Sequence, residues 1–161
     1  MKQLLVALDF SKSTDTVVEQ AANLAKSLEA KLWVLHVTSD ETQAMAYEAA
    51  QFSSYTPEFI DMPGDVQLAR NISADEIKRE HAQLQAISSA LRNNGVNAQA
   101  ILLKGNGAAT IIEKSIDLQV EMIILGSHGH GLLHKALLGS VSQAVIRRAK
   151  CNVMVVPVQD R

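Results

Sequence analysis

The sequence predicts an α/β protein with an open, doubly wound parallel sheet of five strands and helices on both faces. The first observation is that short apolar runs alternate with helical patterns along the chain, an order that implies right-handed crossovers between parallel strands. The second is the length of 161 residues, which fits a single domain over residues 1–161. The third is a composition of 47% hydrophobic and 20% charged residues, which is typical of a globular protein.

The chain begins with a pattern for a strand, a helix and a second strand. The run from Leu4 to Leu8 is continuously apolar, as expected of a strand that is covered on both faces. Ser11 and Ser13 are placed to cap a helix whose apolar residues recur at helical spacing as far as Leu28. The run from Leu32 to Val37 is a second buried strand. Together these patterns predict one β-α-β unit.

The segment 38–72 interrupts this alternation. It contains Pro57, Pro63 and Gly64 among polar and aromatic residues, and it is too long for a plain turn. We expect an inserted short helix and a mobile loop here. A capping box from Ser73 to Glu76, in which each side chain satisfies a free backbone donor, then predicts the start of the next helix.

The second half of the chain returns to the alternation of strands and helices. Asn94 and Gly95 end the helix that starts at Ser73. The run from Val96 to Ala100 alternates apolar and polar residues, which is typical of a half-exposed strand. The remaining predicted elements are a helix after the turn from Gly105 to Gly107, a strand from Met122 to Leu125, a helix from Ser140 to Ala149 and a strand from Val153 to Val158.

Charge and cysteine content exclude several classes of protein. The 15 Lys and Arg residues and 17 Asp and Glu residues give a formal net charge of −2, which provides no electrostatic footprint for nucleic acid or an anionic membrane. The single cysteine, Cys151, excludes an internal disulfide and favours a reducing compartment. No apolar run approaches the roughly 18 residues of a membrane-spanning helix. We therefore expect a cytoplasmic protein with no nucleic-acid or membrane partner.

The glycine-rich segment 126–142 carries the strongest indication of chemistry. It begins where a buried strand ends and finishes where a helix begins, and ligands of open parallel sheets bind beyond the carboxyl ends of the strands. Its glycines let backbone N–H groups approach an anion closely. The run from Gly139 to Ser142 adds two hydroxyls and the positive end of a helix dipole. The alternative interpretation is a flexible loop followed by an ordinary helix cap.

Other motifs in this segment are matched only in part. The spacing from Gly126 to Gly131 is that of a P-loop, but leucines replace the lysine and the hydroxyl residue that grip phosphate and Mg2+. His128, His130 and His134 form a cluster, but only one pair has helical spacing and no fourth ligand is evident. We therefore expect no dedicated metal site.

The pattern Gly126-x2-Gly129-x9-Gly139-Ser140 resembles the nucleotide-binding signature of the universal stress protein family. The strand end from Val6 to Ser11, the pair His36-Val37 and the closing run from Ala149 to Pro157 are also similar to that family. The likeness covers nearly the whole chain. It implies an adenine-nucleotide α-hydrolase-like fold that binds ATP.

The resemblance also implies a role for each matching residue. Asp9 is expected to meet the ribose region of the ligand, and Ala7 and Val37 are expected to flank adenine. The phosphates are expected to be bordered by Gly126, His128 and Gly129 and to receive hydrogen bonds from Gly139, Ser140, Val141 and Ser142. Phe10 stands where many members have glycine and is expected to narrow the entrance.

Asp9 is also a candidate from its position alone. It ends an apolar strand beside a turn rich in hydroxyls. A carboxylate there either accepts a hydrogen bond from a ribose hydroxyl or caps the following helix, and both roles stay open.

These observations favour a stress-response module that binds ATP with Mg2+ and signals by occupancy rather than by turnover. Phosphoryl transfer needs a positioned metal, charge neutralisation and an oriented water, and the signature contains no paired carboxylates. One alternative is a slow ATPase or an autophosphorylating phosphotransferase. In that case His128 or Asp9 would orient the nucleophile, and Ser140 or a nearby hydroxyl would be the candidate site of autophosphorylation. Another is a purely structural dimer. AMP and cyclic nucleotides are alternative ligands.

The last predicted strand suggests a partner. In a doubly wound sheet of order 3-2-1-4-5, the third and fifth strands are the edges. The run from Val153 to Val158 is apolar on both faces, so we expect an identical copy to cover it in a homodimer. The family resemblance implies dimers of this kind, and Pro157 limits the length of the ladder. The competing interpretation is that a helix or the segment 38–72 folds over this edge.

Overall fold

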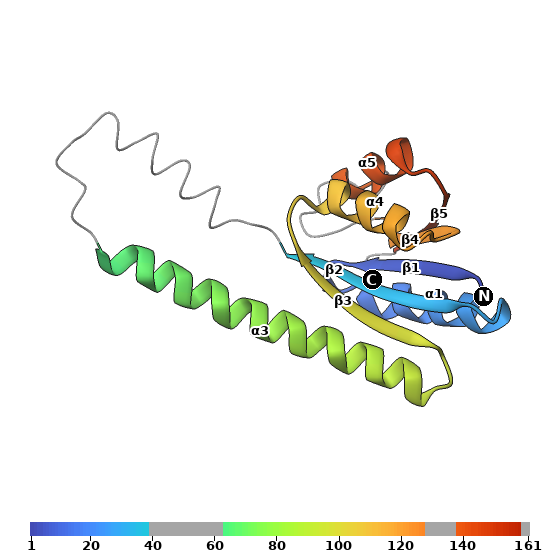
Figure 1. The fold of residues 1–161 in the computed structure, drawn as a ribbon, viewed down its shortest axis with the longest axis horizontal. Helices are drawn as coiled ribbons and strands as arrows, with labels where there is room; N and C mark the ends of the chain where they lie inside the picture. The colour runs from blue at the N-terminus through green and yellow to red at the C-terminus, as the bar shows by residue number, and fades with distance from the viewer. Residues whose placement is uncertain (39–62, 128–137, 159–161) are drawn as a thin grey trace.

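A parallel sheet with the strand order β3-β2-β1-β4-β5 organises the computed structural model, which describes residues 1–38, 63–127 and 138–158, with the backbone alone for 63–73 (Figure 1). The strands are β1 (Gln3–Leu8), β2 (Lys31–Thr38), β3 (Ala98–Lys104), β4 (Met122–Gly126) and β5 (Asn152–Val156). All four neighbouring pairs are parallel. This arrangement confirms the predicted fold class and strand order, with β3 and β5 at the edges.

Helices cover both faces of the sheet. They are α1 (Thr14–Ser27), α3 (Pro63–Asn93), α4 (Gly107–Asp117) and α5 (Ser140–Arg148). Figure 1 shows α1 and α3 on one side of the sheet and α4 and α5 on the other. No helix in the described ranges is both long enough and apolar enough to cross a membrane.

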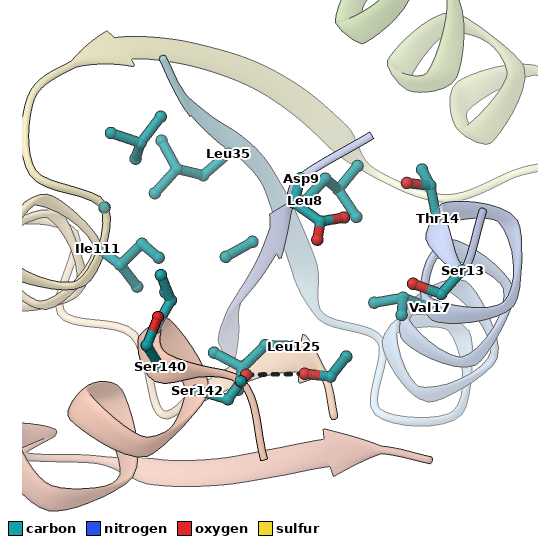
Figure 2. Close-up of a pocket in the computed structure, with 16 residues that line it drawn as sticks. Leu8, Asp9, Ser13, Thr14, Val17, Leu35, Ile111, Leu125, Ser140 and Ser142 are labelled. Carbon is teal, nitrogen blue, oxygen red and sulfur yellow. Dashed lines mark hydrogen bonds between the residues drawn. The ribbon is translucent and has the colours of Figure 1, made fainter. Parts of the chain in front are cut away.

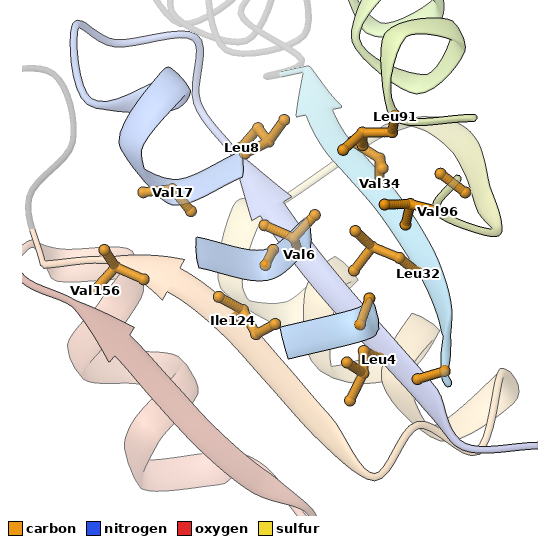
Figure 3. Close-up of a cluster of buried hydrophobic side chains, with 14 of the residues drawn as sticks. Leu4, Val6, Leu8, Val17, Leu32, Val34, Leu91, Val96, Ile124 and Val156 are labelled. Carbon is orange, nitrogen blue, oxygen red and sulfur yellow. The ribbon is translucent and has the colours of Figure 1, made fainter. Parts of the chain in front are cut away.

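Two apolar layers form because successive strand residues point to opposite faces. In β1, Leu4, Val6 and Leu8 belong to the layer under α1 and α3, whereas Leu5 packs under α4 and α5. The first layer continues into buried residues of β2 and of both helices (Figure 3). The second layer includes Ile111 of α4. The continuous apolar run of β1 is therefore explained by burial on both sides.

The helix predicted to begin at Ser73 begins earlier. The backbone of α3 is helical from Pro63, so the prediction of a start at Ser73 is wrong. Proline is well suited to a first helical position, because its fixed φ is helical and its missing N–H would be unpaired there in any case. The capping box lies inside the helix instead. Of the predicted insertion, residues 39–62 lie outside the described part of the chain.

The third strand is shifted relative to its prediction. It was expected from Val96 to Ala100, but β3 runs over Ala98–Lys104 and pairs with β2 along its length. Val96 is still buried in the first apolar layer. The pairing continues as far as Thr38 opposite Lys104, and this long-range contact sets the strand boundaries.

Candidate functional site

A pocket lies at the carboxyl ends of β1, β2 and β4, next to the N-terminal ends of α1, α4 and α5 (Figure 2). This is the edge at which ligands of doubly wound sheets bind. Its lining consists of Ala7, Leu8 and Asp9 from the end of β1, Ser13, Thr14 and Val17 from the start of α1, Leu35 and Val37 from β2, Gly107 and Ile111 from α4, Leu125 and Gly126 from β4, and Gly139, Ser140, Val141 and Ser142 from the start of α5.

The pocket brings together candidate residues from distant parts of the sequence. The candidates that line it are Ala7, Asp9, Val37, Gly126, Gly139, Ser140, Val141 and Ser142. The candidates His128 and Gly129 lie outside the described residues, as do His130 and His134. Within the described ranges, no group of three or more metal-binding side chains is placed to hold an ion.

One side of the pocket is apolar. Leu35 and Leu125 are buried in the second apolar layer together with Ile111, and the half-buried Val37 packs against the same layer. These side chains reach the pocket from β2, β4 and α4 (Figure 2). Such a surface suits the flat, weakly polar face of an aromatic base.

The start of α5 forms the part of the pocket wall that adjoins Ile111 and Leu125 (Figure 2). Gly139 N–H donates to the Ser127 carbonyl at 2.8 Å, and Ser142 Oγ donates to the Gly126 carbonyl at 2.8 Å. These two bonds hold the end of β4 against the first turn of α5. Gln143 N–H donates to the Gly139 carbonyl at 2.9 Å.

This arrangement changes the expected roles of two candidates. Since Gly139 N–H and the Ser142 hydroxyl already donate within the protein, the expected donation from Gly139 to phosphate is not available through its N–H in this conformation. The amides of the first turn of α5 precede the intrahelical bonds and form the positive end of the helix dipole. The Ser140 side chain is exposed and also lines the pocket.

A tight turn connects the end of β1 to α1. Ser11 N–H donates to Asp9 Oδ1 at 3.0 Å, and the hydroxyls of Ser11 and Ser13 lie 2.7 Å apart in a hydrogen bond. Ser13 occupies the N-cap position of α1, but its side chain makes no capping hydrogen bond. The hydrogen bond from Ser11 N–H to Asp9 lies within the turn that precedes the helix.

Phe10 turns away from the pocket. Its ring packs on the ring of His36, with centroids 4.2 Å apart, and it is absent from the residues that line the pocket. The expectation that Phe10 narrows the entrance is therefore wrong. Its backbone lies in the left-handed region, with φ at 56°, and this conformation directs the side chain towards the face of α1 and α3.

His36 contacts the end of β1 on the face of the sheet that α1 and α3 cover. It is buried, and its Nδ1 atom lies 2.7 Å from the Leu8 carbonyl. Because a carbonyl only accepts, Nδ1 carries the hydrogen and donates it. On the other side of the ring, Nε2 lies 3.4 Å from Oε1 of Glu80 in α3, without a hydrogen bond.

Several lining residues were not among the sequence candidates. They are Leu8, Ser13, Thr14, Val17, Leu35, Gly107, Ile111 and Leu125. The sequence could have indicated two of them, because Leu35 shares a strand face with Val37 and Leu125 directly precedes Gly126. No sequence pattern indicated Gly107, because only the packing of α4 beside α5 brings it to the pocket.

Cys151 lies outside the pocket lining. It is partly buried and packs against the apolar layer under α4 and α5. Burial raises the pKa of its thiol. The side chain behaves as a small apolar residue.

Comparisons with known proteins agree with one another. A model of the universal stress protein family matches residues 1–157. The chain is 31% identical over 156 residues to the universal stress protein YxiE of Bacillus subtilis. The aligned residues cover 96% of this chain and 97% of that protein. The fold is similar to that of the universal stress protein UspA from Lactobacillus plantarum, with a TM-score of 0.71, 22% identity and coverage of 96% of this chain and 97% of that one. It is also similar to a universal stress protein solved in complex with cAMP, with a TM-score of 0.62, 19% identity and coverage of 97% and 96%.

Proposed function

Because the chain belongs to the universal stress protein family, we propose that its pocket binds an adenine nucleotide, ATP with Mg2+, and that occupancy of the pocket signals in a stress response. The observation that carries the proposal is the convergence of the described signature residues on one pocket. Gly126, Gly139 and Ser140 come together there with Asp9 and Val37 at the carboxyl ends of three neighbouring strands. The cAMP complex of a structural neighbour supports an adenine nucleotide as the class of ligand.

Different parts of the pocket suit different parts of a nucleotide. The apolar side formed by Leu35, Val37 and Ile111 suits adenine. The first turn of α5 suits the phosphates, since backbone amides and the helix dipole favour negative charge. Asp9 lies at the end of β1, towards the start of α1, and suits the ribose (Figure 2).

The donor set of the pocket is compatible with Mg2+. This ion prefers oxygen ligands, keeps several waters and is usually bound through one or two carboxylates together with substrate phosphates. Ser140 adds a hydroxyl oxygen on the phosphate side, where the phosphates and waters would supply the other ligands, and Asp9 and Ser13 line the other end of the pocket (Figure 2). When bound, Mg2+ would neutralise part of the phosphate charge. These residues would orient the nucleotide.

Slow hydrolysis or autophosphorylation is the second candidate. It is favoured by the exposed Ser140, a hydroxyl residue at the helix end that suits the phosphates. Among the described residues that line the pocket there is no second carboxylate beside Asp9, so rapid turnover has little support.

The test begins with the small molecules that denaturation releases from the purified protein, identified by mass spectrometry. Released ATP supports the proposal, and ADP alone supports turnover. The stripped protein is then titrated calorimetrically with ATP and Mg2+, beside Gly139→Val. The φ of −60° at Gly139 accepts an L side chain, so this variant should fold and lose affinity because the branched group fills the pocket. A stripped parent protein that binds no adenine nucleotide would refute the proposed function.

A further inference from the structure

The hydroxyl of Thr14 has a position that the fold does not explain. Thr14 is the first residue of α1, and the residue is only 7% exposed. Its Oγ1 atom is buried without a hydrogen-bond partner among the described residues. The same residue lines the pocket, and Figure 2 shows its oxygen directed towards Asp9 and the pocket interior. A buried hydroxyl of this kind destabilises the folded state unless something satisfies it.

The neighbouring polar groups already have partners. The hydroxyls of Ser11 and Ser13 bind one another, and Asp9 Oδ1 accepts from Ser11 N–H. Thr14 stands apart from this set, since it lines the pocket and its Oγ1 atom has no hydrogen-bond partner among the described residues. We therefore expect a molecule bound in the pocket to supply that partner.

The charge around Thr14 indicates which part of a ligand it would meet. Asp9 lines the same end of the pocket, and a carboxylate disfavours phosphate but accepts hydrogen bonds from hydroxyls. The phosphates have a better site at the first turn of α5, on the other side of the cavity. The group beside Asp9 and Thr14 should therefore be neutral and should carry hydroxyls. In a nucleotide, that group is the sugar.

We propose that Thr14 is a specificity-determining residue whose hydroxyl binds a sugar hydroxyl of the nucleotide, so that the pocket prefers ribonucleotides to their deoxy analogues. This inference rests on the proposed function. Both the 2′-hydroxyl and the 3′-hydroxyl have the required chemistry, and ligands that lack one or the other distinguish them.

The experiment is a calorimetric titration of stripped protein with ATP, 2′-deoxy-ATP and 3′-deoxy-ATP, each with Mg2+. The variants are Thr14→Val, which keeps the side-chain shape and removes the hydroxyl, and Thr14→Ser, which keeps the hydroxyl. Thr16→Val is the matched control, because Thr16 is exposed on the same helix and does not line the pocket.

Thr14→Val should bind ATP roughly two- to tenfold more weakly than the parent, and Thr14→Ser and Thr16→Val should bind ATP as the parent does. For one of the two deoxy analogues, parent and Thr14→Val should bind equally, because the partner of the hydroxyl is missing there. Equal ATP binding by parent and Thr14→Val would overturn the inference. So would an equal loss for ATP and both analogues.

A second measurement does not depend on the ligand. Without nucleotide, Thr14→Val should unfold at the same temperature as the parent or a higher one, because an unpartnered buried hydroxyl has been removed. A lower unfolding temperature would show that the hydroxyl has a structural partner and would overturn the inference. If the parent binds none of the three nucleotides, the proposed function fails; if it binds ATP and Thr14→Val binds it equally, only the role of Thr14 fails.

Discussion

The Asp9 carboxylate accepts a hydrogen bond from Ser11 N–H at 3.0 Å and also lines the pocket. Its backbone position follows from β1, whose last residue is Leu8. The turn bond fixes the orientation of the side chain, so a carboxylate stands at the strand end before any ligand arrives. Preorganisation of this kind reduces the conformational entropy lost on binding.

The two roles of Asp9 are separable by substitution. Asp9→Asn keeps an oxygen that can accept from Ser11 N–H, but it removes the charge. We expect an unchanged unfolding temperature and a loss of about 1.5–3 kcal/mol in ATP binding, which is roughly ten- to a hundredfold in affinity. Titration calorimetry measures the affinity. Asp117→Asn, an exposed carboxylate at the end of α4, is the control. Equal affinity of Asp9→Asn and the parent would restrict Asp9 to its role in the turn.

The elements around the pocket are held by contacts at their ends as well as by the apolar layers. His36 of β2 donates to the Leu8 carbonyl at the end of β1, and Phe10 packs on its ring. Glu80 of α3 faces the same ring from the other side. Helix α3 is thereby connected to the strand end that carries Asp9, although none of the α3 side chains that the structure describes lines the pocket.

Removal of the imidazole should weaken this connection. His36→Phe leaves the Leu8 carbonyl without its donor and Glu80 without the facing ring nitrogen. We expect the free energy of unfolding to fall by about 1–3 kcal/mol, measured by urea denaturation. His81→Phe is the control, because His81 is exposed on the same helix. If both variants unfold like the parent, the contacts of His36 contribute nothing measurable to stability.

At the level of the assembled protein, β5 is an edge of the sheet, and among the described strands it pairs with β4 alone. Val153, Met154 and Val155 are only partly buried, although they pack against the two apolar layers. The strand carries no charged residue that would discourage pairing with another chain. We therefore propose, as part of the function above, a homodimer through β5 in which two copies pair antiparallel about a two-fold axis.

A charge placed on this edge should separate the copies. Sedimentation equilibrium at micromolar concentration should show a dimer for the parent and a monomer for Val155→Lys. Gln99→Lys introduces the same side chain at an exposed position of β3, the opposite edge, and should remain dimeric. Circular dichroism checks that both variants are folded. A monomeric parent, or a dimer that Val155→Lys leaves intact, would exclude β5 as the interface.

Local patterns in the sequence were sufficient for the element order, and the resemblance to the universal stress protein family supplied the candidate residues. Apolar runs such as Leu4 to Leu8 indicate strands buried on both faces, and the spacing of Gly126, Gly139 and Ser140 indicates the strand end and helix start that meet at the pocket. Such features depend on periodicity and backbone freedom over a few residues, so the sequence carries them directly.

Other features were decided only by the tertiary structure, because they depend on which groups meet across elements. The left-handed backbone of Phe10 and its contact with His36 turn that ring out of the pocket. Gly139 N–H, which was expected to donate to phosphate, donates to the Ser127 carbonyl instead. Helix α3 begins at Pro63 despite a capping pattern ten residues later in the chain, at Ser73. Thr14 becomes a candidate only because packing buries its hydroxyl in the pocket lining with no hydrogen-bond partner among the described residues, and no local pattern encodes that combination.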